Sequence, residues 1–172
     1  MYKVKKKETF IPSSNGKDKL HVIVWEPQGE IRAILQISHG MIELIDRYDE
    51  FARYLAAKGF VVAGNDHLGH GETARDEDEL GYFPGVNGSE TVVDDLYKVT
   101  TSIRAQYPRL PYFLLGHSMG SFMARRYLMT YGRQLDGAIL MGTGSQPPAL
   151  LSAAKTTANS LSLVRGEHHR SQ

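Results

Sequence analysis

The alternation of two hydrophobic patterns through the middle of the chain constrains its fold more than any other feature. Short, nearly continuous apolar runs are separated by longer segments in which apolar residues recur every three or four positions. Continuous runs are typical of parallel strands buried on both faces, and the recurring pattern is typical of amphipathic helices. The sequence therefore predicts an α/β fold, with helices on both faces of a parallel sheet. The apolar runs lie at residues 33–37, 60–63, 112–115 and 138–141.

Three helices are expected between these runs, each with an apolar stripe and a residue that ends it. Gly59, Pro108 and Gly132 end the three helices in turn, because glycine and proline interrupt a helix. We interpret each stripe as core packing rather than as a ligand surface. The stripes are Tyr48, Phe51, Ala52 and Leu55, then Val92, Leu96, Val99 and Ile103, and finally Met119, Phe122, Met123 and Tyr127.

The two ends of the chain depart from this alternation. Residues 5–11 and 20–25 alternate polar and apolar side chains on either side of a turn at 12–16, which predicts an antiparallel hairpin. With the four apolar runs, the hairpin brings the expected sheet to six strands. Beyond Gly142, prolines and polar residues interrupt the pattern. Residues 149–164 are expected to form a mildly amphipathic helix with no strand after it.

Composition limits the classes of partner and cofactor. The 172 residues carry a formal net charge of +1, which gives no reason to expect nucleic acid. There is no cysteine, which excludes disulfides and Cys-based metal sites, and we expect neither a metal nor a cofactor. The lysines at positions 3 and 5–7 are interpreted as a solvated edge strand, with a lipid-headgroup patch as the alternative.

No segment of the sequence has the character of a membrane anchor. No apolar run approaches the ~20 residues of a membrane span. The first residues, MYKVKKKETF, contain no apolar core of signal-peptide length. We therefore expect a soluble, cytoplasmic protein without an integral membrane segment.

The sequence GHSMG, at residues 116–120, is the strongest candidate for a catalytic motif. It lies between an apolar run and an expected helix, so Ser118 would occupy a turn from strand to helix. A serine nucleophile at such a turn has strained dihedral angles and needs small neighbours, which Gly116 and Gly120 provide. The turn also places Ser118 at the carboxyl end of a strand, where open α/β sheets form their sites. We interpret Ser118 as a nucleophile, with a purely structural turn as the alternative.

Acyl transfer through Ser118 would also need donors for an oxyanion. The backbone N–H of Met119 is one candidate, because it follows the nucleophile at the start of a helix. The second candidate is the N–H of Met41, in the loop after the run at 33–37, where Gly40 permits a turn. We interpret His39, in the same loop, as a structural residue of that turn.

At this point the chain resembles a known family, the monoacylglycerol lipase and lysophospholipase group of α/β-hydrolases, which is similar to the S33 serine aminopeptidases. The resemblance implies the α/β-hydrolase fold, Ser118 as the nucleophile, and the amides of Met41 and Met119 as the oxyanion hole. Its motifs are HGMIELIDRY at 39–48, NDHLGHGET at 65–73, VVDDL at 92–96 and LPYFLLGHSMGS at 110–121.

The resemblance also implies roles for residues in two loops. Glu43 and Arg47 match a Glu and an Arg of the family pattern, at the polar end of the acyl pocket. There they would order the site or bind the alcohol portion of the substrate, and an i,i+4 ion pair without substrate contact is the alternative. Asp66, His67 and His70 match a loop whose role we take to be architectural.

A serine nucleophile requires a histidine base and a carboxylate, which follow the serine in α/β-hydrolases. The histidines after Ser118 are His168 and His169, and the acids are Asp136 and Glu167. None of them is in a suitable position.

The resemblance then implies that the chain ends inside the cap, before the last two strands of the usual sheet. We expect residues 1–144 to form an incomplete α/β-hydrolase core and residues 145–172 the start of a cap or lid. The chain is expected to be the N-terminal part of a longer hydrolase, with a short protein lacking a triad as the alternative.

The resemblance implies a carboxylic ester hydrolase of the lysophospholipase or monoacylglycerol lipase kind, acting on a small lipid or ester through an acyl-enzyme. The alternatives are an inactive module that binds lipid or protein, and peptidase, thioesterase or acyltransferase chemistry, which share the serine turn. The last apolar run, 138–141, should be an exposed sheet edge that a second polypeptide or a second copy could complete.

Overall fold

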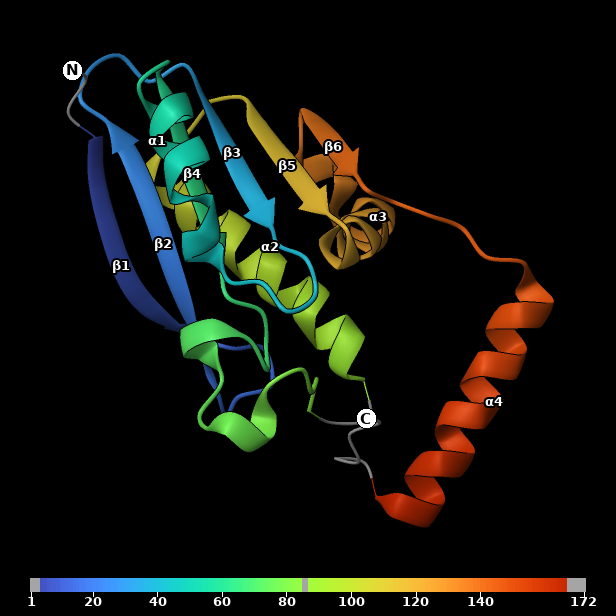
Figure 1. Cartoon of the computed structure of the whole chain (residues 1–172). Coiled ribbons are helices and arrows are strands. Elements are labelled where there is room, and N and C mark those ends of the chain that lie inside the picture. Colours follow the sequence, from blue (N-terminus) through green and yellow to red (C-terminus); the bar gives the residue numbers. More distant parts are fainter. Residues whose placement is uncertain (1–3, 85–86, 167–172) are drawn as a thin grey trace.

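The computed structural model describes residues 4–84 and 87–166, which contain a six-stranded sheet with helices on both faces (Figure 1). The strands lie in the order β1-β2-β4-β3-β5-β6. They are β1 (Val4–Pro12), β2 (Lys19–Pro27), β3 (Ala33–Ser38), β4 (Phe60–Asn65), β5 (Tyr112–His117) and β6 (Gly137–Met141). The α-helices are α1 (Asp49–Ala56), α2 (Gly88–Gln106), α3 (Met119–Tyr131) and α4 (Pro148–Arg165). Short 3-10 turns are η1 (Ile45–Tyr48), η2 (Gly71–Thr73), η3 (Glu77–Glu79) and η4 (Gly132–Gln134).

The pairing of the strands brings two loops together at the carboxyl ends of the parallel strands. β1 and β2 form the predicted antiparallel hairpin, and β2 also pairs antiparallel with β4. β3 pairs parallel with both β4 and β5, and β5 pairs parallel with β6. Ser38, the last residue of β3, lies opposite Gly116 of β5. The loops that follow β3 and β5 therefore start side by side, and the predicted α/β fold is confirmed.

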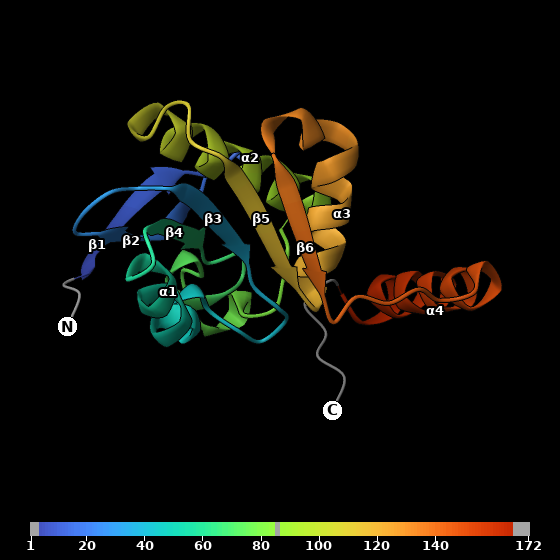
Figure 2. The ribbon, with the colours of Figure 1, turned by 90° about the horizontal axis from the view of Figure 1, so that it is seen from above.

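Helices cover the two faces of the sheet, α1 on one face and α2 with α3 on the other (Figure 2). Alternate residues of β3 point to these two layers, as the pleat of a strand requires. Leu35 and Ile37 belong to the apolar cluster that contains Ala52 of α1. Ile34 belongs to the cluster that contains Val99 of α2. All four residues of the predicted α2 stripe are buried, which confirms that stripe as core packing.

The stripes predicted for the first and third helices are wrong in part. Phe51 of α1 and Phe122 of α3 are 41% and 48% exposed. From the stripe predicted for α3, Tyr127 is buried, and three small residues outside that stripe are buried with it: Gly120, Ser121 and Ala124. A Cβ atom on Gly120 would collide with the carbonyl oxygen of Ser38, so α3 lies too close to β3 for large side chains there. Small residues therefore make this packing, which an apolar pattern does not reveal.

A buried polar network fixes α2 and α3 to the sheet. The side-chain amide of Gln36 donates to the Leu96 carbonyl oxygen at 3.0 Å. Its Oε1 accepts from the hydroxyls of Thr100 at 2.7 Å and Tyr112 at 2.6 Å. The hydroxyl of Tyr127 donates to Thr100 at 2.9 Å. Because these buried groups are paired with one another, the network holds both helices in one register against β3 and β5.

The C-terminal part of the described chain is barely covered. β6 is the last strand of the sheet, and its Ile139, Leu140 and Met141 are 50%, 37% and 46% exposed. α4 stands away from the sheet after an extended segment, and none of its residues is buried (Figure 1). The expected exposed apolar edge is thus present. Among helices in the described ranges, none combines the length and apolar content needed to cross a membrane.

Candidate active site

Ser118 occupies the turn between β5 and α3. Its backbone has φ 51° and ψ −117°, a region that non-glycine residues rarely adopt. Its N–H donates to the Met141 carbonyl oxygen of β6 at 2.9 Å, and its own carbonyl oxygen accepts from the Ser121 N–H at 2.9 Å. These bonds hold the strained turn at the carboxyl end of the sheet. The turn is the one that the GHSMG sequence predicts.

The two glycines around Ser118 permit the close packing that the turn needs. A Cβ atom on Gly116 would lie 2.8 Å from the Cβ of Ala124, inside the first turns of α3. A Cβ atom on Gly120 would collide with the Ser38 carbonyl oxygen and would lie 2.6 Å from that of His39. Neither contact can be relieved by moving a flexible side chain. Glycine at both positions is therefore a requirement of the backbone geometry.

The loop after β3 contains the second expected oxyanion donor. Its Met41 and Ile42 are 64% and 88% exposed, and Ile42 has a left-handed φ of 57°. Among the described residues, no acceptor takes a hydrogen bond from the Met41 N–H or from the Met119 N–H. The two amides follow neighbouring parallel strands, β3 and β5. Both remain available to an acceptor from outside the described chain.

Glu43 connects this loop to the Ser118 turn. Its Oε2 accepts from the Gly40 N–H at 2.8 Å and from the Tyr48 hydroxyl at 2.9 Å, and lies 3.1 Å from His117 Nδ1. Burial opposes ionisation, but these hydrogen bonds outweigh burial and lower the pKa of Glu43 below its ordinary value. The Glu43 carboxylate therefore stays charged and binds three separate segments of the site.

Arg47 forms the ion pair with Glu43 that was the alternative interpretation. Its guanidinium lies 3.4 Å from Glu43 Oε1, at i,i+4 spacing, and its side chain is 67% exposed. Because the Arg47 side of the pair is open to solvent, which screens its charge, the pair contributes roughly 0.3–0.5 kcal/mol to stability. Arg47 is thus placed at the rim of the loop, where most of its surface contacts solvent.

Tyr48 and His117 belong to this arrangement, and the sequence pattern does not point to either residue as part of the site. The sequence pattern places Tyr48 in an apolar stripe, but the residue lies in η1 and its hydroxyl donates a hydrogen bond to Glu43. Its hydroxyl also lies 3.1 Å from His117 Nδ1. The only signal for His117 was its position beside Ser118 in GHSMG. The contact with Glu43 spans 74 positions of sequence and follows from the sheet register.

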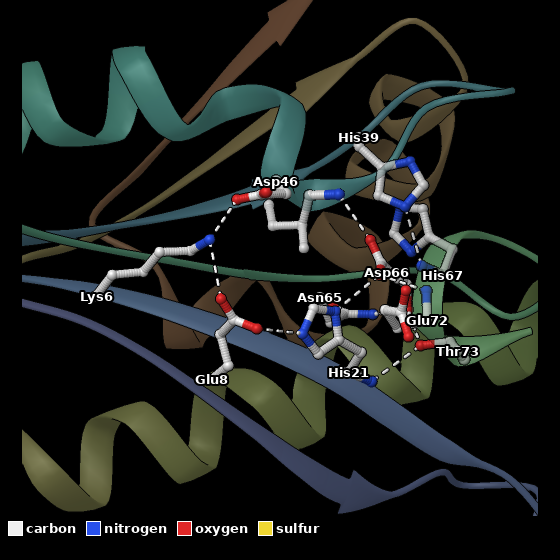
Figure 3. A network of polar contacts seen from close by, with 11 residues as sticks. Lys6, Glu8, His21, His39, Asp46, Asn65, Asp66, His67, Glu72 and Thr73 are labelled. Carbon is white, nitrogen blue, oxygen red and sulfur yellow. Dashed lines mark hydrogen bonds and ion pairs between the residues drawn. The ribbon is translucent and has the colours of Figure 1, made fainter.

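The loop after β4 has the architectural arrangement that was proposed for it. Asp66 is buried and accepts from the backbone N–H groups of Ile45 at 2.7 Å and Glu72 at 2.9 Å. Its Oδ2 also lies 2.9 Å from Nδ1 of the buried His21 (Figure 3). One carboxylate therefore joins β2, η1 and the turn at η2. None of these contacts involves Ser118.

The Asp66 network continues outward to the edge strand β1. His21 Nε2 lies 3.5 Å from Glu8, and the Lys6 ammonium lies 2.9 Å from Glu8 and 2.6 Å from Asp46 (Figure 3). Lys6 thus connects β1 to η1 at the surface. This pairing fits the interpretation of Lys5, Lys6 and Lys7 as part of an edge strand, and Lys3 lies outside the described residues.

Three buried histidines pack together beneath the loop after β3. The rings of His39 and His67 are 4.1 Å apart, and those of His39 and His70 are 5.3 Å apart. Burial lowers the pKa of His39 to about 4 and that of His67 well below its ordinary value, so both rings are neutral at pH 7. Within residues 4–84 and 87–166, no group of three or more ligating side chains is arranged to hold a metal ion.

The residues that could activate Ser118 are not found in the described part of the chain. No histidine within residues 4–84 and 87–166 hydrogen-bonds to the Ser118 hydroxyl. His168, His169 and Glu167 lie outside those residues. Asp136 accepts from the Tyr112 N–H at 2.8 Å, at the beginning of β5, whereas Ser118 follows its end. Asp136 therefore lies at the amino ends of the strands, the opposite end from Ser118, and is not placed for a triad.

Comparison with known proteins finds one matching family model and relatives that are named as lipases. The family model for serine aminopeptidase, S33, matches residues 29–169. Monoglyceride lipase from Rattus norvegicus is 36% identical over 96 residues, which are 56% of this chain and 30% of that protein. Monoacylglycerol lipase from Mycolicibacterium smegmatis is 30% identical over 137 residues, 77% of this chain and 47% of that protein.

The fold is also found among solved structures. A thermostable carboxyl esterase from Bacillus coagulans matches with a TM-score of 0.81 and 37% sequence identity. The match covers 94% of this chain and 55% of the esterase. The chain therefore spans about a third to about half of the length of these relatives.

Proposed function

We propose that this chain, which belongs to the serine aminopeptidase S33 family of α/β-hydrolases, carries the nucleophile and oxyanion donors of a carboxylic ester hydrolase. The observation that carries the proposal is the strained turn at Ser118, between a buried parallel strand and a helix. Relatives named as monoglyceride lipase and carboxyl esterase support an ester substrate. The proposed substrate class is a monoacyl lipid, either a monoacylglycerol or a lysophospholipid.

In the proposed reaction, the Ser118 Oγ attacks the ester carbonyl carbon and transfers its proton to a base. The carbonyl oxygen becomes an oxyanion, which accepts hydrogen bonds from the backbone N–H groups of Met41 and Met119. The carbon–oxygen bond to the alcohol then breaks, and the alcohol leaves with the proton from the base. Attack by water on the acyl-serine releases the fatty acid and restores Ser118.

The base and its supporting carboxylate are proposed to come from outside residues 4–84 and 87–166. In α/β-hydrolases both follow the nucleophile in the sequence. They would approach the carboxyl ends of the strands from a longer version of the protein or from a second polypeptide. We propose residues 1–144 as core and 145–172 as the start of a cap. The exposed strand β6 is then the edge at which the sheet is completed.

Glu43 and Arg47 are proposed to have different roles. Glu43 is half-buried and holds backbone and side-chain groups on both sides of the site, so we assign it to the order of the loop. Arg47 is exposed beside the same loop, so its guanidinium could reach the alcohol portion of a bound ester. On this assignment, Arg47→Ala raises KM with little change in kcat.

A fluorophosphonate probe tests the proposal, because it forms a covalent bond with an activated serine. We expect labelling that Ser118→Ala abolishes and that Ser145→Ala, in the exposed segment before α4, leaves unchanged. Labelling of a longer version of the protein alone would place the base beyond these residues. Labelling that survives in Ser118→Ala would contradict the assignment of the nucleophile.

A second function is an inactive module that binds lipid or protein. The observation in its favour is that no described histidine hydrogen-bonds to Ser118. If neither this chain nor a longer version reacts with the probe, this function replaces the first. If labelling occurs, a panel of ester, thioester and peptide substrates separates ester hydrolysis from the other chemistries of the serine turn.

A further inference from the structure

We propose that His39, as the neutral Nδ1-protonated tautomer, is a positioning residue that aims the Met41 N–H into the oxyanion site. This inference rests on the proposed function, since it assigns a purpose to the Met41 donor. It assigns to His39 more than the turn-forming role expected from the sequence.

The hydrogen bonds of His39 determine its tautomer. The backbone N–H of His67 lies 3.0 Å from His39 Nε2, and an N–H can only donate. His39 Nε2 must therefore accept and carries no proton. On the other side of the ring, Nδ1 lies 2.8 Å from the Gly40 carbonyl oxygen, which can only accept. The Nδ1–H donates to it, so both ring nitrogens are satisfied in one tautomer.

The environment of His39 preserves this neutral state. The side chain is fully buried, and burial lowers its pKa to about 4. A second ring proton would also point Nε2–H at the His67 N–H, donor against donor. The ring therefore keeps its bond to Gly40 throughout the neutral pH range.

The Gly40 carbonyl and the Met41 N–H belong to the same peptide unit. No described peptide bond is cis, so the C=O and N–H of this unit point in opposite directions. When His39 fixes the carbonyl oxygen toward the buried ring, it turns the Met41 N–H away from the core. A hydrogen bond to the carbonyl also polarises the peptide and strengthens its N–H as a donor.

The peptide unit before Gly40 is held as well. The Gly40 N–H donates to Glu43 Oε2 at 2.8 Å, so both units flanking Gly40 have fixed orientations. A Cβ atom at Gly40 would lie 2.9 Å from that oxygen and 3.3 Å from His117 Nδ1. A purely structural turn would usually satisfy its own amides. Here two side chains restrain the loop while the Met41 N–H has no acceptor among the described residues.

Three variants of the full chain separate positioning from stability. His39→Leu removes both hydrogen bonds, whereas His39→Gln can donate to Gly40 through its amide and accept from the His67 N–H through its oxygen. His70→Leu removes another buried histidine, which bonds to the Leu68 carbonyl oxygen and not to Gly40. His39→Leu and His70→Leu should both lower stability, so stability alone does not decide the question.

NMR of the full chain tests the inference without requiring activity. At pH 7, the ¹⁵N spectrum should show His39 protonated on Nδ1 only. The Met41 amide resonance should shift in His39→Leu and stay near its wild-type position in His39→Gln and His70→Leu. A ring protonated on Nε2, or a Met41 resonance that His39→Leu does not move, would overturn the inference. The tautomer measurement uses the wild-type chain, so it holds even if a variant fails to fold.

Fluorophosphonate labelling links the same residue to chemistry. A donor misplaced by about 1 Å can cost roughly 100-fold in rate, so His39→Leu should slow labelling of Ser118 by about 10- to 100-fold. His39→Gln should recover most of the rate, and His70→Leu should leave it unchanged. If the wild-type chain is silent toward the probe, the NMR result alone decides the role of His39. Equal labelling rates in wild type and His39→Leu would refute that role while leaving Ser118 as the nucleophile.

Discussion

β5 and β6 are neighbouring parallel strands with similar apolar sequences, but their surroundings are opposite. Leu114 of β5 is fully buried between the helical layers, whereas Leu140 of β6 is 37% exposed. α3 repeats the contrast with α4, since α3 buries four residues against the sheet and α4 buries none. The difference shows that an apolar strand sequence does not by itself determine burial. What matters is whether another part of the polypeptide covers it.

We call β3, β5 and helices α1 to α3 the packed region, and β6 and α4 the exposed region. The candidate site lies on the border between these two regions. The proposed nucleophile Ser118, the expected oxyanion donors and the Glu43 network all belong to the packed region. The Ser118 N–H, however, donates to Met141 of the exposed strand. The strained turn is therefore built by the packed region, and it faces the edge at which we propose that the sheet is completed.

The largest expected effect on stability comes from adding a side chain at Gly120, where α3 approaches β3 closely. In Gly120→Val, the new Cβ collides with the backbone of Ser38, which cannot move without displacing β3. We expect a loss of more than about 4 kcal/mol in the free energy of unfolding, or failure to fold. Urea denaturation followed by circular dichroism measures it.

The matched control is Gly144→Val in the exposed segment before α4. A Cβ atom there meets no heavy atom within 4 Å. Its stability should stay within about 0.5 kcal/mol of wild type. If Gly144→Val were as damaging as Gly120→Val, the segment before α4 would be packed and the contrast between the regions would fail.

A smaller effect is expected for truncation of a leucine in each strand. Leu114→Ala removes a fully buried side chain and leaves a cavity between layers, which should cost about 3 kcal/mol. Leu140→Ala removes a side chain that is 37% exposed at the sheet edge, and should cost less than about 1 kcal/mol. The two unfolding midpoints, measured on the same day in urea, provide the comparison. Equal losses would mean that β6 is covered in solution.

Lowering the pH from 7 toward 4 should destabilise the packed region specifically. The pKa of His39 falls from its ordinary 6.5 to about 4 on burial, so the unfolded chain binds more protons between these values. His39 therefore favours folding fully above pH 6.5, and this contribution disappears as the pH falls toward 4. The difference corresponds to about 3 kcal/mol, and burial of His67 acts in the same direction.

The control for the titration is His39→Gln. This variant is expected to lose less stability than wild type between pH 7 and 4.5, because glutamine does not titrate. β6 and α4 contain no histidine, so hydrogen exchange should show the acid-induced opening in the packed layers. An identical pH dependence in both proteins would show that His39 is not responsible.

Several elements of this structure could be predicted because they depend on local sequence. The α2 stripe, the hairpin and the turn at Ser118 each follow from periodicity or from glycine at defined positions. The exposure of Phe122 could not be predicted, because it depends on how closely α3 approaches β3. Gly120 permits that approach, and the apolar pattern gives glycine no weight.

The Glu43 network was missed for a different reason. The partners of Glu43 are one histidine, His117, and one tyrosine, Tyr48. They come from separate segments, which meet only when β3 and β5 align in register. The spacing of these residues in the sequence does not predict that they come into contact. Likewise the tautomer of His39 follows from a bond to His67, 28 positions away. Polar contacts between loops thus require the sheet before they can be recognised.

The smallest effect on stability should come from Ile139→Lys on β6. Ile139 is 50% exposed, so replacing it removes little buried surface, and the free energy of unfolding should change by less than about 1 kcal/mol. The effect on association should be much larger, because an open apolar edge strand recruits other strands and a lysine there opposes it. Sedimentation over a range of concentrations should show less self-association than in wild type. Thr143→Lys adds the same charge just beyond the strand and should change association less. If Ile139→Lys instead lost as much stability as Leu114→Ala, something would already cover β6, and the proposed site for completing the sheet would have to lie elsewhere.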